Sequence, residues 1–187
     1  RAGACRQLED AIDTAISLGA SKGVVHADSD AVPEVWDHST IRERIHDSID
    51  RLTTYCKNDD FVVCVENVKS PFIDAADVPA LLEKTSAEIC LDTGHAHVTG
   101  QDASDLAMVI RRWGDRITHV HLNDTRRESD DEHLPVGMGS IEFEALADAM
   151  IDANWSGSCT HEIFGFDIEY ARYGRERFNE LLGTRQC

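Results

Sequence analysis

The sequence lacks the features that mark a membrane protein or a secreted one. Its 187 residues contain no apolar run near the roughly 18 residues that a membrane-spanning helix needs. The first five residues lead directly into a polar, helix-like segment, so we expect no signal peptide, and the missing Met suggests a processed N-terminus. With 42% hydrophobic and 28% charged residues, the chain has the composition of one globular domain with no membrane association.

Cysteines in a redox or metal-binding spacing are also missing. The six Cys residues are scattered without a CxxC motif, and Cys64, Cys90 and Cys159 lie inside apolar, strand-like runs. A free thiol in such a run behaves as a small hydrophobic side chain. We therefore expect reduced, structural thiols in a cytoplasmic protein rather than a disulfide framework.

Lysine is scarce, and acidic residues predominate. Thirty-five acidic residues against 18 basic ones, only four of them Lys, give a net charge of −17. A surface this negative repels a phosphate backbone, which disfavours nucleic-acid binding without excluding it. An Asp-rich, Lys-poor composition is also typical of a halophilic cytoplasmic protein, and high salt would screen that repulsion to short range.

What the sequence does contain is a regular alternation of strand-like and helix-like segments. Apolar runs predict strands at 23–26, 61–65, 87–91, 117–122 and 157–163. Helical periodicity predicts helices near 8–18, 41–52, 77–84, 103–113, 141–153 and 168–182. Strands that are each followed by a helix indicate a parallel α/β sheet.

Polar side chains at the strand ends favour a barrel over a doubly wound sheet. Four predicted strands each end in a side chain that can bind a metal: His26, Glu66, Asp92 and Glu162. The remaining predicted strand, at 117–122, carries His119 and His121 near its end. Such convergence at the C-terminal ends of parallel strands is typical of the mouth of a (β/α)8 TIM barrel. A complete barrel has eight strands and roughly 250 residues. We therefore predict an N-terminally truncated partial barrel, with about five βα units in one domain over 1–187 and about three units absent.

Four of these residues form a predicted metal site: Glu66, Asp92, His121 and Glu162. Each follows hydrophobic strand sequence, where an uncompensated charge is costly to bury. A single strand-end acid is often only a helix cap, but four donors on separate strands favour a shared ion. Three carboxylates and one imidazole suit Mn²⁺, Mg²⁺ or Co²⁺, also accept Zn²⁺, and leave positions open for substrate oxygens.

A second polar group lies close by. His95 follows the third predicted strand and faces the same mouth, and Asp131 and His133 lie in the polar loop after the fourth. Together with His26 they could hold a further ion or bind a substrate. Taken alone, Asp131 and His133 fit a solvated loop equally well.

Three further features leave alternatives open. His119 lies two residues from His121 and shares its face at a different depth, so its role stays ambiguous. His161 should face the covering helices, because it alternates with Glu162 along the strand. The GMGS segment at 137–140 precedes a helix and could hold a phosphate, although glycine pairs in loops are usually turns.

Three motifs together resemble those of the xylose-isomerase-like TIM-barrel superfamily. They are CLDTGHAH at 90–97, HVHLND at 119–124 and DEHLPVGMGSI at 131–141. That superfamily includes sugar phosphate isomerases and epimerases, ketose 3-epimerases, inosose dehydratases and the endonuclease IV group (AP endonuclease family 2). The match runs in order along the chain, from His26 to Glu162.

The resemblance implies that the four predicted ligands hold a divalent metal ion and that Glu66 and Glu162 also form the acid/base pair. It further implies substrate binding by His95 and Arg127. We therefore expect a metal-dependent sugar phosphate isomerase or epimerase acting on a small sugar or polyol-derived substrate, with homo-oligomer formation left open. One departure is that ketose 3-epimerases carry a second Glu six residues after the first metal-binding Glu, where this chain has Phe72.

The resemblance also carries two alternatives. In an endonuclease IV-like, three-zinc phosphodiesterase acting on abasic DNA, the additional ligands match His26, His95, Asp131 and His133. Against this, the sequence shows no cluster of Arg, Lys and aromatic residues to hold a kinked duplex. The third hypothesis is an inosose-dehydratase-like lyase, with the same proton abstraction followed by loss of a hydroxyl group. A non-catalytic fragment is the remaining interpretation, because an open barrel leaves strand edges unpaired.

Overall fold

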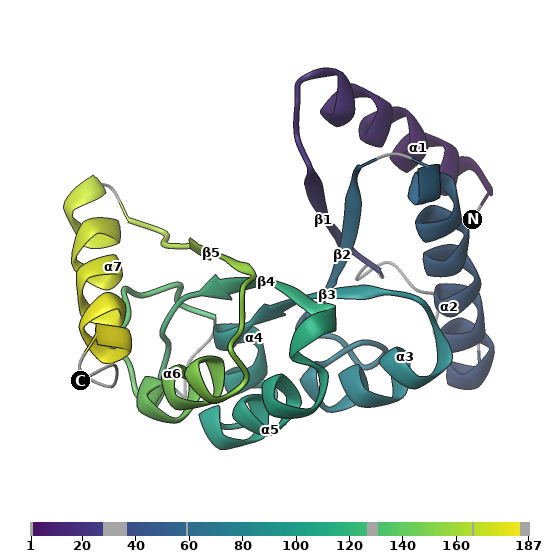
Figure 1. Cartoon of the computed structure of the whole chain (residues 1–187). Helices are drawn as coiled ribbons and strands as arrows, with labels where there is room; N and C mark the ends of the chain where they lie inside the picture. Colours follow the sequence, from purple (N-terminus) through teal and green to yellow (C-terminus); the bar gives the residue numbers. More distant parts are fainter. Residues whose placement is uncertain (1, 28–36, 59, 127–130, 166, 184–187) are drawn as a thin grey trace.

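The fold is an α/β half-barrel in which five parallel strands curl into one concave sheet (Figure 1). The computed structural model describes residues 2–27, 37–58, 60–126, 131–165 and 167–183. The strands are β1 (Lys22–His26), β2 (Val62–Glu66), β3 (Glu88–Asp92), β4 (Ile117–Leu122) and β5 (Ser158–His161), and they lie side by side in chain order. The predicted parallel sheet and partial TIM barrel are confirmed.

Helices cover the convex side of this sheet (Figure 1). They are α1 (Ala2–Ser17), α2 (His38–Tyr55), α3 (Val78–Lys84), α4 (Thr93–Val98), α5 (Ala103–Trp113), α6 (Phe143–Asp152) and α7 (Ile168–Gly183), with short 3-10 turns η1 (Cys56–Asn58), η2 (Ala75–Asp77) and η3 (Gly114–Arg116). The sequence pattern missed α4, a single short helix directly after β3. Its first turn is capped by the Asp92 carboxylate, which accepts a hydrogen bond from the His95 amide at 2.7 Å.

The core lies between the convex face of the sheet and the helices. Leu91 of β3 and Val120 of β4 pack there with Ile110 of α5 and Leu146 of α6, and all four are fully buried. Burying one such side chain contributes about 1.5–3 kcal/mol. Because side chains alternate along a strand, the neighbours of these residues face the concave interior. Packing on the convex side therefore fixes the polar side chains on the other.

Strand register brings the strand-end residues to one rim. His26 is paired with Glu66 across β1 and β2, and Asp92 with His121 across β3 and β4. Beyond the end of β5, the amide of Glu162 still donates to the last carbonyl of β4, at 3.2 Å. Since all strands are parallel, these residues share the C-terminal end of the sheet, where barrel active sites lie.

The described residues leave the half-barrel open at its two edge strands. β5 is shorter than predicted, ends at His161, and has exposed side chains over most of its length. Cys159 is consequently exposed, although its apolar, strand-like run predicted a thiol that behaves as a small hydrophobic side chain, whereas Cys5, Cys56, Cys64 and Cys90 are buried. In this described part of the chain, no helix has both the length and the apolarity to cross a membrane.

Candidate metal centre

The four predicted metal ligands converge at the mouth of the half-barrel. Donor atoms of Glu66, Asp92, His121 and Glu162 all lie within 4.8 Å of one another. His121 Nδ1 is 3.0 Å from Glu162 Oε2, 3.2 Å from Glu66 Oε1 and 3.7 Å from Asp92 Oδ2. The structure therefore brings together four donors that are up to 96 positions apart in the sequence.

The group concentrates negative charge in a buried place. The Glu66 side chain is 2% exposed and Asp92 is fully buried, whereas Glu162 is 33% exposed and so is the most accessible carboxylate of the group. Burial raises the pKa of Asp92. Burial alone would also raise the pKa of Glu66, but hydrogen bonds with imidazoles, chiefly that of His121, lower it.

The pKa of the His121 imidazole also depends on this environment. Burial alone would lower the pKa of His121, but its close polar contacts with Cys90, Glu162 and Glu66 raise it to about 12. A proton on this ring is thus the positive charge that offsets the carboxylates when no cation lies between them.

Two asparagines that the sequence analysis missed hold Asp92 in place. Asn67 Nδ2 donates to the Asp92 carbonyl at 3.0 Å, and the Asp92 amide donates to Asn67 Oδ1 at 2.8 Å. Asn123 Nδ2 donates to Asp92 Oδ2 at 2.8 Å. Outer partners of this kind fix the orientation of a metal ligand. The available signal was their position, because each Asn comes directly after a strand end.

The second predicted group assembles next to the first. Asp131 Oδ2 lies 2.9 Å from His95 Nε2 and 3.0 Å from His133 Nε2. His95 Nδ1 is 3.3 Å from Glu66 Oε1, which links the two groups. The alternative of a solvated loop is wrong, because the His133 side chain is 5% exposed.

Hydrogen bonding within this group sets its charges. Burial alone would lower the pKa of His95, but hydrogen bonds with Asp131 and Glu66 raise it to about 11. Burial alone would raise the pKa of Asp131, but its imidazole partners His133 and His95 lower it. Phe164 covers one side of the group, stacked on the His133 ring with centroids 3.8 Å apart.

The remaining predicted site residues lie at the border of the site or outside the described part. His26 Nε2 approaches Glu66 Oε2 to 3.2 Å, although most of the His26 side chain is exposed. Arg127 lies outside the described residues, so its predicted substrate contact stays a prediction. His161 faces α7, where a Cβ placed on Gly174 would lie 3.4 Å from the His161 ring, as its alternation with Glu162 predicts.

The loop after β4 is held by a buried carboxylate rather than by a bound anion. Asp124 Oδ2 accepts hydrogen bonds from the amides of Gly137 at 2.9 Å and Gly139 at 2.8 Å. Both amides are therefore unavailable to a phosphate. The hypothesis that the segment 137–140 holds a phosphate is thus wrong for the amides of Gly137 and Gly139. A Cβ on Gly139 would lie 2.3 Å from Asp124 Oδ1, so this close approach requires glycine. Asp124 thus anchors the loop that carries Asp131 and His133.

The donor set fits a divalent cation. Oxygen Oε2 of Glu162 is buried and receives no well-oriented hydrogen bond, although His121 Nδ1 is 3.0 Å away. Oδ1 of Asp131 is likewise buried without a hydrogen-bond partner. Buried carboxylate oxygens normally have partners, and a cation held between these groups would supply them. A group of three carboxylates and one imidazole is of the kind that binds Mn²⁺, Mg²⁺, Co²⁺ or Zn²⁺.

Comparison with known proteins assigns the family. The family model described as "Xylose isomerase-like TIM barrel" matches residues 1–181, and the chain belongs to this family. A solved structure described as a D-tagatose 3-epimerase-like protein superposes with a TM-score of 0.80 at 23% identity. That superposition covers 97% of this chain and 69% of the other.

Two curated relatives represent different activities within the family. A probable endonuclease 4 of Mycobacterium leprae is 29% identical over 153 residues, which cover 76% of this chain and 58% of that protein. D-psicose 3-epimerase of Enterocloster bolteae is 30% identical over 91 residues, or 49% of this chain and 27% of that enzyme. The chain spans about half the length of the curated relatives it matches first.

Proposed function

We propose that this member of the xylose isomerase-like family is a divalent-metal-dependent isomerase or epimerase for a small polyhydroxy carbonyl compound, such as a sugar or sugar phosphate. One observation carries the proposal: the carboxylates of Glu66 and Glu162 approach the same nitrogen of His121, to 3.2 and 3.0 Å. Two carboxylates so placed can act from two sides on one substrate bound between them. The similarity to epimerases supports this choice.

Glu66, Asp92, His121 and Glu162 would hold the metal ion. When bound, a divalent ion polarises a substrate carbonyl and so acidifies the neighbouring C–H bond. The asparagines on Asp92 keep its carboxylate pointed into the site in the absence of any ligand.

The two glutamates would move the proton. Glu162 is the more accessible of the two, so we assign it the removal of the proton from the substrate carbon. Glu66, deeper in the site and in contact with His26, His95 and His121, would return a proton to the opposite face or to the neighbouring atom. General acid/base catalysis of this kind contributes about 10²- to 10⁴-fold in rate.

His95 would orient a substrate hydroxyl. Its ring lies between the two polar groups, 3.3 Å from Glu66 Oε1 and 2.9 Å from Asp131 Oδ2. The contacts at Nδ1 hold the ring, so Nε2 can turn from Asp131 to a substrate hydroxyl in one fixed direction, which favours one substrate orientation.

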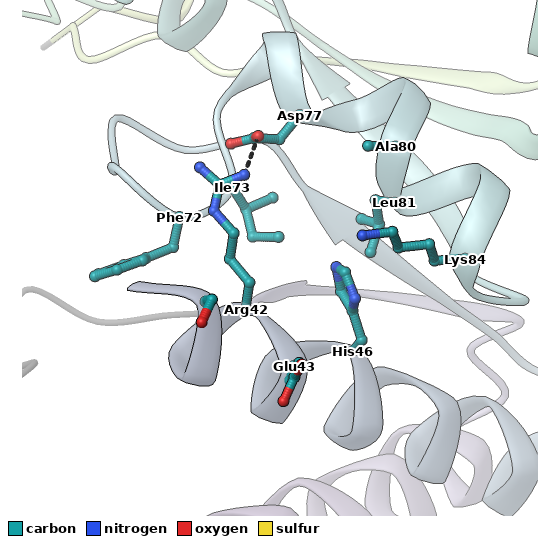
Figure 2. Close-up of a pocket in the computed structure, with 10 residues that line it drawn as sticks. Arg42, Glu43, His46, Phe72, Ile73, Asp77, Ala80, Leu81 and Lys84 are labelled. Carbon is teal, nitrogen blue, oxygen red and sulfur yellow. Dashed lines mark hydrogen bonds and ion pairs between the residues drawn. The ribbon is translucent and has the colours of Figure 1, made fainter. Parts of the chain in front are cut away.

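The substrate class is wider than that of ketose 3-epimerases. By the resemblance described above, ketose 3-epimerases carry a second glutamate at the position that Phe72 occupies here. Phe72 provides no carboxylate and lines a crevice between α2 and α3 (Figure 2). Arg42, in the same crevice, forms an ion pair with Asp77 (Figure 2). We therefore include aldose–ketose isomerisation and epimerisation at other carbons in the substrate panel.

A panel of aldoses, ketoses and their phosphates, assayed with Mn²⁺, Mg²⁺, Co²⁺ or Zn²⁺, tests the proposal. Glu162→Gln should lower turnover by about 10²- to 10⁴-fold while the protein stays folded. Glu83→Gln is the matched control, because Glu83 is an exposed residue paired with Arg112 outside the site. Full activity of Glu162→Gln would show that the proposed proton transfer is wrong. Mass analysis of products would reveal loss of water if the reaction is instead a dehydration.

A second candidate is supported by the His95–Asp131–His133 group. It lies directly beside the first group and shares a contact with Glu66, so the mouth can accommodate more than one ion. The similarity to a probable endonuclease 4 makes a zinc-dependent phosphodiesterase acting on abasic DNA the corresponding activity. A duplex with one abasic site separates the two, because only the nuclease would cleave it. Elemental analysis adds to this test, since one Mn, Mg or Co ion per chain supports the isomerase.

A further inference from the structure

The concave interior below the mouth is lined by polar side chains. In most TIM barrels this layer is filled by branched apolar residues. Here Cys90 precedes Asp92 by two residues and so faces the same interior, and His119 occupies the corresponding place before His121 on β4. Burying such groups is unfavourable unless they have partners. Neither Cys90 nor His119 has a part in the proton transfer proposed above.

Cys90, His119 and His121 come together in this layer. The Cys90 sulfur and one nitrogen of each imidazole lie within 4.8 Å of one another. The two rings meet edge to face, with centroids 5.2 Å apart. Cys90 is fully buried and His119 is 9% exposed. These donors lie one layer below the carboxylates of the mouth.

We propose that Cys90, His119 and His121 form a second metal site, which binds a thiophilic divalent ion such as Zn²⁺ or Cd²⁺. One thiolate and two imidazoles form a donor set typical of zinc, whereas Mg²⁺ and Mn²⁺ prefer the oxygen-rich mouth. Zinc ligands lie about 2.0–2.3 Å from the ion, so donors in a tetrahedral site are roughly 3.3–3.8 Å apart. The donor atoms lie within 4.8 Å of one another, so binding of the ion would require side-chain rotations that bring them closer together.

The surroundings suit a cation. The carboxylates of Glu66, Asp92 and Glu162 also contact His121, and they favour positive charge in this part of the interior. Cys90 loses its proton when it binds the ion, as thiol ligands do. The carboxylates of the mouth contact His121 through Nδ1, so the inner ion would bind Nε2. The imidazole of His121 would then join the two sites.

Edge strand β5 supplies the outer partners and the access route. His119 Nδ1 is 2.7 Å from Ser158 Oγ, and His119 Nε2 is 3.1 Å from Thr160 Oγ1. Nδ1 can keep its contact with Ser158, which orients the ring, while Nε2 turns from Thr160 to the ion. Ser158 and Thr160 are exposed, so solvent ions reach His119 past this edge and water can complete the coordination.

Cobalt is a direct probe of the inner site, because a Co²⁺–thiolate bond gives a charge-transfer absorption band in the near ultraviolet that oxygen and nitrogen ligands do not give. We expect this band when reduced protein is titrated with Co²⁺ in a background with both Cys159→Ser and Cys187→Ser. These changes remove the exposed thiol of the described residues and the thiol of Cys187, which lies outside them. Cys90→Ser and His119→Gln should lose or strongly weaken it. Cys64→Ser is the matched control, because Cys64 is also fully buried in a strand but belongs to none of the metal-binding groups of the described residues.

Asp92→Asn separates this proposal from the proposed function. Asp92 belongs only to the mouth, so Asp92→Asn should lose activity and keep the thiolate band. The proposal is overturned if the reduced protein shows no thiolate band at saturating Co²⁺, or if the band persists in Cys90→Ser. The first of these outcomes needs no substitution in the inner group, so it can overturn the proposal even if a variant of that group fails to fold.

Discussion

Glu66 Oε1 lies 3.2 Å from His121 Nδ1, although Glu66 ends β2 and His121 lies on β4, with β3 between them. Strands two apart in a sheet are separated by roughly 10 Å. Side chains can bridge that gap only on a concave face, where they lean toward a common centre. The curvature of the half-barrel is therefore what makes the candidate metal centre.

Asn67→Ala should weaken metal binding without unfolding the protein. Asn67 makes two hydrogen bonds to the backbone of Asp92, and its own carbonyl oxygen lies 3.0 Å from His95 Nδ1. Loss of an outer partner typically reduces metal affinity or activity by about 10- to 100-fold. Calorimetric titration with Mn²⁺ measures the change, and Asn179→Ala, an exposed position on α7, is the control. Unchanged affinity in Asn67→Ala would show that Asp92 is oriented by other contacts.

Metal binding should release protons and become tighter as the pH rises. In the metal-free protein, the pKa of His121 is raised to about 12, so the ring is protonated at neutral pH and must lose that proton to bind an ion. Because the folded-state pKa is raised, the stabilisation from this proton is complete below the usual imidazole pKa and disappears as the pH rises toward 12.

Calorimetry in two buffers of different ionisation enthalpy counts the protons released. We expect about one proton from His121 at pH 7, and none would contradict its role as a ligand. The metal-free protein should also lose stability at alkaline pH, and bound metal should reduce that loss.

Asp124→Ala should destabilise the protein and disorganise the loop after β4. Asp124 is fully buried and accepts hydrogen bonds from the amides of Gly137 and Gly139, which would be left unsatisfied. Hydrogen bonds to a charged group contribute about 1.5–3 kcal/mol each. We expect the free energy of unfolding to fall by about 3 kcal/mol or more in urea titrations. Asp115→Ala, at an exposed position, should change it by less than about 0.5 kcal/mol.

Gly139→Ala should impair the site more than the fold. Its new methyl group would lie 2.3 Å from Asp124 Oδ1 and 2.6 Å from the Thr125 carbonyl, so the loop must shift. Because that loop carries Asp131 and His133, we expect lower activity and weaker binding of any second ion. Gly3→Ala is the opposite case, since Gly3 lies in α1 with nothing within 4 Å of a new Cβ. That change should stabilise the protein by about 0.5–1 kcal/mol and leave activity unchanged. Equal effects of both changes on activity would contradict this account of the loop.

Most of the fold could be predicted from the sequence because the apolar pattern reports local periodicity. Continuous apolar runs identified the strands, and spacing by three and four identified six of the seven helices in the described residues. Helix α4 was not predicted, because it has fewer than two turns and begins at a capping contact from Asp92 rather than at a periodic pattern. The exposure of Cys159 was not predicted, because the apolar pattern does not show that β5 lies at a sheet edge.

The sequence by itself determined which residue types stand at the ends of the strands, and therefore that Glu66, Asp92, His121 and Glu162 share one rim. Only the tertiary structure decided how close they come, which groups hold them, and that the loop with Asp131 and His133 folds back onto the same mouth. The physical reason is that strand-end chemistry follows from local order along the chain. Contacts such as those of Asn67 or Asp124 depend instead on sheet curvature and register, which arise from packing between distant segments.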